Sequence, residues 1–159
     1  MGCMITDARD HPEIRRRVTE LMRPRQKRIH FHDESLPERR RLIAGFAELP
    51  LQVVVAVARI GHEVDAEHAR ALCLRELVEL LQHQRVARMV LESRHDDRRD
   101  AHTIIAARHS EPLLVFEHRQ PSGEPMLWIA DGVAWAGGVR GTDLDRFGRV
   151  LARVIEVGQ

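Results

Sequence analysis

An apolar stretch that contains a single charge constrains the fold of this chain more than any other feature. From Met126 to Val139, every residue except Asp131 is apolar or glycine. Such a run is typical of a helix that is buried nearly all round. An isolated carboxylate is costly to remove from water, so it needs a cation, a metal ion or strong hydrogen-bond donors. The sequence therefore predicts either a functional site at Asp131 or a salt bridge between Asp131 and a buried arginine.

Length and composition indicate a globular protein. A chain of 159 residues is long enough to bury a sizeable core as one domain. No apolar run reaches the roughly 18 residues that a membrane helix needs. The N-terminus carries no basic and then apolar signal segment. We therefore expect a single cytoplasmic domain over residues 1–159 without a membrane partner. Length and composition do not determine the oligomeric state.

Strand-like and helix-like segments alternate along the chain. The run Leu51–Ala58 is rich in valine and predicts a strand buried on both faces, and Val64–Gln84 predicts the longest helix. The other expected strands are Gly2–Thr6, Arg28–His32, Ala87–Glu92, Leu113–His118 and, as an alternative to a helix end, Val154–Val157. The other expected helices run from Asp10 to about Met22, from Ser35 to Pro50, over Arg99–Arg108, around Asp131 and over Asp143–Ala152. This alternation predicts an α/β sheet with parallel strand pairs covered by helices.

Glu92 is a candidate site residue because it ends an expected strand. Ligand-binding groups in open α/β sheets gather outside the carboxyl ends of the strands. The alternative is a solvated glutamate that pairs with Arg94 or with the cluster Arg98–Arg99. The following segment, His95–Asp100, is crowded with possible ligands. The alternative is a polar loop with Asp97 or Asp100 near a helix start, where acids complement the helix dipole.

His30 and His32 are candidate metal ligands. Two residues apart in an expected strand, they would point to the same face, and Asp33 and Glu34 follow directly. The alternative is a chance pair, because the chain contains ten histidines.

Basic side chains concentrate in the first part of the chain. The first 60 residues carry 12 lysines and arginines against 8 acidic residues. The excess lies in Arg15–Arg17, Arg23–Arg28 and Arg39–Arg41. These clusters indicate either binding to nucleic acid or solvated helix faces.

Three segments together resemble a known family. They are Arg28-Ile-His-Phe-His32, Val90-Leu-Glu-Ser-Arg94 and Glu124-Pro-Met-Leu-Trp-Ile-Ala-Asp131-Gly-Val-Ala-Trp-Ala136. The chain resembles a large bacterial family of domains of unknown function, in an arginine-rich form similar to its actinobacterial members. The ribonuclease H-like fold is ascribed to that family, so the resemblance implies a mixed sheet flanked by helices.

The resemblance also implies a metal-dependent acidic site. In ribonuclease H-like nucleases, carboxylates hold divalent ions that activate water for phosphodiester cleavage. Carried over by position, Glu92 would be the strand acid and Asp131 the helix acid. His30 falls where family members often place a polar or acidic residue. Hard oxygen ligands suit Mg²⁺ or Mn²⁺.

The chain departs from the family pattern at its N-terminus. Family members usually open with a strand carrying Asp-Glu-Ser-Gly, whereas this chain opens with Met1-Gly-Cys-Met-Ile-Thr6. We therefore expect a domain without the first-strand acid, or one whose true start lies upstream. The expected function is a divalent-metal-dependent nuclease, and the alternative is a non-catalytic nucleic-acid-binding or protein-interaction module on the same scaffold.

Overall fold

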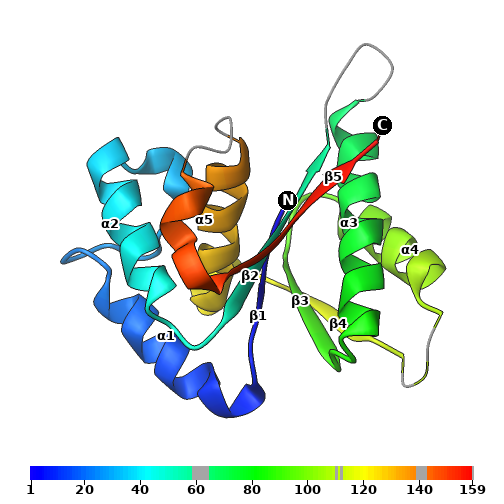
Figure 1. Ribbon diagram of the computed structural model, residues 1–159, viewed down its shortest axis with the longest axis horizontal. Helices are drawn as coiled ribbons and strands as arrows, with labels where there is room; N and C mark the ends of the chain where they lie inside the picture. Colours follow the sequence, from blue (N-terminus) through cyan, green and yellow to red (C-terminus); the bar gives the residue numbers. More distant parts are fainter. Residues whose placement is uncertain (59–64, 110, 112, 139–142, 159) are drawn as a thin grey trace. The chain divides into compact units, whose positions relative to one another are not determined.

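The computed structural model describes residues 1–58, 65–109, 111, 113–138 and 143–158 (Figure 1). Helices and strands alternate along the chain, which confirms the α/β class, and the strands form two small sheets. Within the described residues, no helix combines the length and hydropathy needed to cross a membrane.

The chain forms two compact units. The first contains Met1, residues 56–120 and residues 155–159, and the second contains residues 2–55 and 121–154. Strands β2 (Gln52–Ala58) and β5 (Leu151–Val157) contribute residues to both units. The single domain that the length favours stays a prediction.

The second unit is built around helix α5 (Met126–Gly138), which packs along strand β1 (Gly2–Ile5). β1 pairs antiparallel with β2, with Gly2 opposite Val55. A Cβ at Gly2 would lie 2.2 Å from the Ala130 carbonyl oxygen, so only glycine permits this approach of strand and helix. The other helices of the unit are α1 (His11–Glu20), α2 (Leu36–Ala47) and the 3-10 helices η1 (Ala8–Asp10), η2 (Phe31–Asp33), η3 (Pro121–Gly123) and η4 (Leu144–Val150).

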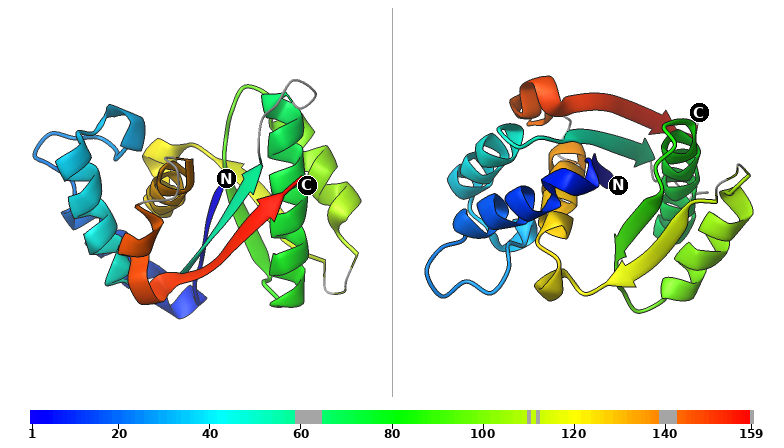
Figure 2. Two further views of the ribbon diagram at one scale, coloured as in Figure 1. Left: turned by 45° about the horizontal axis from the view of Figure 1, so that its top comes forward. Right: turned by 90° about the horizontal axis from the view of Figure 1, so that it is seen from below.

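The first unit contains a parallel pair of strands, β3 (Arg88–Glu92) and β4 (Val115–Arg119). Helices α3 (Ala66–His83) and α4 (Asp97–Ala107) pack against each other and lie on the same face of the pair (Figure 2). The expected parallel pair covered by helices is therefore present. Because the two strands are parallel, both of their carboxyl ends lie at the same edge of this sheet.

Most of the expected elements are confirmed with small shifts at their ends. The Ser35 hydroxyl accepts a hydrogen bond from the Glu38 N–H at 3.4 Å and caps α2, as expected from a serine that precedes Pro37 and Glu38. The long helix is α3, which begins after a cap at Asp65. Val64, its expected start, lies outside the described residues.

One expected element is wrong and another is shorter than expected. Arg28–His32 is not a strand, because the segment leads into the 3-10 helix η2 and its backbone groups pair with side chains from α2 and α5. Asp143–Ala152 is helical only over Leu144–Val150, where it forms the 3-10 helix η4, which is interrupted at Gly148 (φ +52°) and followed directly by β5. Val154–Val157 therefore belongs to a strand.

Candidate functional site

Asp131 lies at the middle of α5 and is half-buried. Its Oδ2 atom accepts a hydrogen bond from the backbone N–H of Phe31 at 2.9 Å. Across the described residues, no cationic side chain approaches the Asp131 carboxylate within 4.0 Å. The carboxylate therefore has a strong donor, as expected, but no arginine of the described residues is paired with it.

Gly132 and Asp131 together position Phe31 against helix α5. Phe31 is fully buried, and a Cβ at Gly132 would lie 2.6 Å from the Phe31 ring. The missing side chain at Gly132 thus makes room for the ring, while Asp131 holds the amide. The ring also packs beside Phe46 and Trp135, each with a centroid distance of 6.0 Å.

Arg39 holds the same segment from α2. Its guanidinium donates to the carbonyl oxygens of Phe31 and His32, and it lies 4.8 Å from the centre of the Trp135 ring. Asp131 and Arg39 therefore occupy backbone groups that a strand would use for its ladder. This pairing is the physical reason why the expected strand does not form.

The two candidate histidines lie on this anchored segment. Nδ1 of His30 is 3.0 Å from Oδ2 of Asp33, and the rings of His30 and His32 are 6.1 Å apart. The hydrogen bond with His30 lowers the pKa of Asp33. Because the Phe31 amide that Asp131 binds follows His30 directly, His30 and Asp131 belong to the same local structure.

Glu92 belongs to the other unit. It is the exposed last residue of β3 and lies opposite Arg119 of β4 in the parallel register. Arg94, one of its expected partners, forms two hydrogen bonds with Glu67 instead, at 2.7 and 2.6 Å. The joint site of Glu92 with Asp131 stays a prediction.

A buried ion pair that the sequence did not indicate lies in the first unit. Asp100 of α4 is 3% exposed, and Arg70 of α3 donates to both of its carboxylate oxygens, at 3.0 and 2.6 Å. Nε of Arg94 lies 3.6 Å from the same carboxylate. The expected position of Asp100 in the first turn of a helix is confirmed, but its partner 30 residues away carries no local sequence signal.

The other acids near Asp100 are also engaged. Asp97 accepts hydrogen bonds from the Arg94 backbone N–H at 2.7 Å and from the Ser93 hydroxyl at 2.8 Å, and these bonds lower its pKa. The side-chain hydrogen bonds with Arg94 lower the pKa of Glu67 to about 2. The carboxylates of this cluster are thus held by arginines and hydrogen-bond donors.

His118 of β4 faces this cluster. Its Nε2 atom lies 3.8 Å from Asp100 and 4.0 Å from Asp97, and it is buried without a hydrogen-bond partner in the structure. The imidazole therefore lies beside two carboxylates whose hydrogen bonds go elsewhere.

The part of the chain that the structure describes contains no group of three or more histidine, cysteine, aspartate or glutamate side chains arranged to hold a metal ion. Mg²⁺, however, keeps several of its waters and is usually bound through one or two carboxylates, so a site at Asp131 does not require such a group. No family model, curated protein or solved structure matches the chain.

Proposed function

We propose that this chain is a ribonuclease H-like α/β protein that acts on nucleic acid, with Asp131 as the carboxylate of a divalent-cation site for phosphodiester hydrolysis. The observation that carries the proposal is the environment of Asp131. It is a half-buried carboxylate on an apolar helix, bound by one backbone N–H and by no cationic side chain of the described residues.

The electrostatics of this position favour a bound cation. A hydrogen bond from a neutral amide lowers the cost of burying a carboxylate but leaves its negative charge uncompensated. Oδ1 of Asp131 has no hydrogen-bond donor among the described residues, so it is the oxygen that a cation would use. Mg²⁺ or Mn²⁺ suits such a hard oxygen ligand.

His30 is the second group that we assign to this site. Its Nδ1 atom faces Asp33, which leaves Nε2 for a ligand. The hydrogen bond between Asp131 and the Phe31 amide fixes the backbone next to His30 and so limits the positions that the imidazole can reach. When bound, the divalent cation would supply an activated water and compensate the charge that develops on the phosphate.

The order of the elements supports the ribonuclease H-like fold. Strand β3, which ends in Glu92, strand β4 and the late apolar helix α5 with one acid follow each other along the chain, in the order on which the resemblance rests. Glu92 stays the proposed strand acid of such a nuclease, at the carboxyl end of β3.

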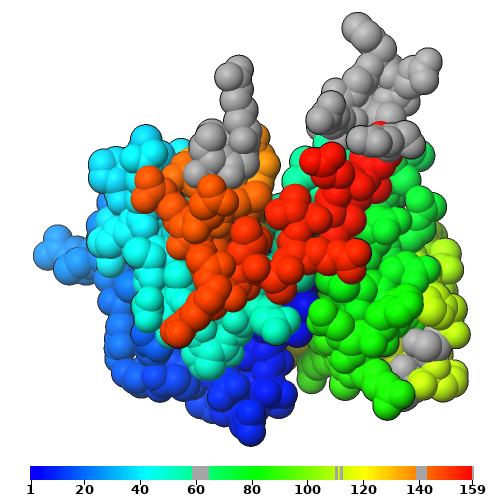
Figure 3. All heavy atoms as spheres, in the orientation of Figure 1, coloured from blue at the N-terminus to red at the C-terminus, as the bar shows by residue number. Residues whose placement is uncertain are grey.

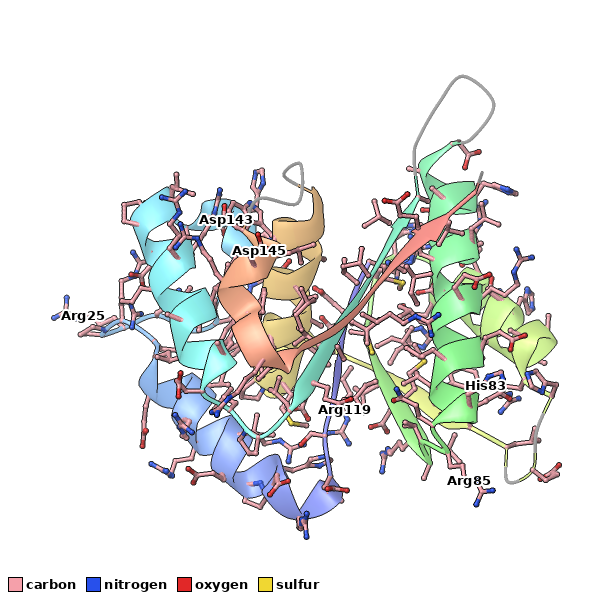
Figure 4. The ribbon with its side chains drawn as sticks, viewed as in Figure 1. Arg25, His83, Arg85, Arg119, Asp143 and Asp145 are labelled. Carbon is pink, nitrogen blue, oxygen red and sulfur yellow. The ribbon has the colours of Figure 1, made fainter. Side chains whose placement is uncertain are left out.

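The experiment is a calorimetric titration with Mn²⁺ of the wild-type chain, Asp131→Asn and Asp145→Asn. Asparagine keeps an oxygen that accepts from the Phe31 N–H but removes the charge, so the fold is preserved. Asp145 is exposed in the same unit and provides a control of equal charge change (Figure 4). We expect binding to disappear in Asp131→Asn and to persist in Asp145→Asn. Equal binding in all three proteins, or none in the wild type, would overturn the proposal.

A further inference from the structure

A strained turn follows α1. The N–H of Gln26 donates to the Arg23 carbonyl at 3.1 Å and closes a four-residue turn with Pro24 and Arg25 at its centre. Arg25 has φ +68°, in the left-handed region that favours glycine. Because proline fixes φ of Pro24 at a negative value, this is a type II turn, in which the third position usually holds glycine or asparagine. An arginine there carries a conformational cost.

Contacts with a buried glutamate fix this turn in place. The side-chain amide of Gln26 accepts a hydrogen bond from the Arg23 backbone N–H at 3.0 Å and donates one to the Glu34 carboxylate at 2.7 Å. The Arg23 guanidinium lies 2.8 Å from the other oxygen of Glu34, which is 5% exposed. The surrounding structure therefore imposes the unfavourable backbone of Arg25, a pattern that is common at functional sites.

The turn and the residues after it present cations that form no ion pair with any of the described residues. Arg25, Lys27 and Arg28 are exposed, and within the described residues none of them has an ion pair. Arg16 of the preceding helix α1 differs, since it pairs with Glu13 and Glu20. The loop projects from the surface in Figure 3, and the Arg25 side chain points away from the ribbon in Figure 4.

We propose that this turn is a phosphate-binding element that contacts the backbone of a nucleic acid, with Arg25 at its tip and Lys27 and Arg28 beside it. The choice of nucleic acid rests on the proposed function. A fixed turn suits arginine, whose planar guanidinium binds a phosphate through two hydrogen bonds. The segment from Arg23 to Arg28 contains no aromatic or long aliphatic side chain that would enter a lipid surface, which favours nucleic acid over a membrane.

The structure offers a matched control in Arg85. Arg85 is also exposed, also has a positive φ (+56°) and follows the C-terminal cap of α3, Gln84, in the other unit. Replacement of either arginine by glycine removes one charge and relieves the same kind of backbone strain. Both Arg25→Gly and Arg85→Gly should therefore be at least as stable as the wild type, so unfolding cannot explain a loss of binding.

The experiment measures fluorescence anisotropy of a labelled single-stranded DNA 20-mer, with EDTA present, at several salt concentrations. We expect Arg25→Gly to weaken binding about fivefold and Arg85→Gly to leave it unchanged. In the triple variant Arg25→Gly, Lys27→Ala, Arg28→Ala, the slope of log affinity against log salt concentration should be smaller in magnitude by about 2. Each contacted phosphate of a single strand contributes about 0.7 to this slope.

Two results would overturn this inference. One is equal DNA affinity and salt dependence in the wild type and the triple variant. The other is loss of binding to anionic phosphatidylserine vesicles in the triple variant without any DNA binding by the wild type, which would identify a membrane as the partner. Because EDTA removes divalent ions, neither result depends on the cation site at Asp131.

Discussion

Asp100 and Asp131 are two helical carboxylates that are removed from solvent to different degrees, and they are stabilised by different partners. Asp100 receives two hydrogen bonds from the Arg70 guanidinium, with Arg94 and His118 close by. Asp131 receives one hydrogen bond from the neutral amide of Phe31. The charge of Asp100 is thus neutralised by an arginine, whereas no cationic side chain of the described residues pairs with Asp131. The kind of partner therefore distinguishes the two carboxylates.

The difference follows the degree of burial. Asp100 is 3% exposed and requires an opposite charge, because a fully buried carboxylate without one is strongly destabilising. Asp131 is half-buried and keeps access to solvent, so one amide donor is enough to hold it. This residual access is also what would admit a hydrated divalent ion.

The largest effect is expected when the partner of Asp100 is removed. Arg70→Met keeps much of the arginine stem but leaves the carboxylate without its two donors, and it should lower the free energy of unfolding by about 3 kcal/mol. Urea denaturation measures the loss. The control is Arg75→Met at an exposed position of the same helix, with a change of less than about 0.5 kcal/mol. A double variant with Asp100→Leu should recover most of the loss. If Arg70→Met is as stable as the wild type, Asp100 does not depend on its arginine.

A smaller effect is expected at the contact beside Asp131. Gly132→Ala would place a methyl group 2.6 Å from the Phe31 ring and should cost about 2 kcal/mol by overpacking. Gly138→Ala is the matched control on α5, because a Cβ there meets no atom within 4 Å. Thermal unfolding of the two variants measures the difference. Equal midpoint temperatures of unfolding in the two variants would show that the Phe31 ring does not pack against Gly132.

The smallest effect is a pH dependence in the cluster around Asp100. The side-chain hydrogen bonds between Glu67 and Arg94 lower the pKa of Glu67 from 4.5 to about 2 in the folded state. A group with a lowered pKa stabilises the fold above its unfolded pKa, and this contribution is lost as the pH falls through the folded value. The stability difference between the wild type and Glu67→Gln should therefore be constant above about pH 5 and shrink between pH 4.5 and about 2.

Urea denaturation at several pH values checks this dependence. Glu156→Gln, at an exposed position of β5, provides the control. Its difference in stability from the wild type should not shrink over the same pH range. A difference between the wild type and Glu67→Gln that does not change with pH would contradict the ion pair with Arg94.

The sequence predicted the elements whose signals are local. The valine run of β2, the Ser35 cap of α2 and the apolar spacing of α3 each depend on neighbouring residues, and all three are confirmed. The helix expected over Asp143–Ala152 is shorter, because Leu144 and Phe147 have helical spacing and are buried, yet Gly148 adopts φ +52° and interrupts the helix.

The candidate sites depend on partners that are distant in the sequence. Asp131 binds an amide 100 residues away, and Arg15, part of an expected basic cluster, pairs with Glu124 at a separation of 109 residues. Composition indicates that a buried carboxylate needs a partner, but it does not say whether that partner is an arginine or a peptide N–H. For Arg28–His32, the same distant contacts replaced a strand ladder with side-chain hydrogen bonds.

The most direct test of the contrast between Asp100 and Asp131 is the NMR signal of the Phe31 amide during a titration with Mn²⁺. This proton lies in the hydrogen bond to Asp131, so a paramagnetic ion on that carboxylate must broaden its signal. We predict selective broadening at low Mn²⁺ in the wild type and none in Asp131→Asn. An unchanged Phe31 signal in the wild type, or broadening that survives Asp131→Asn, would contradict a cation site at Asp131.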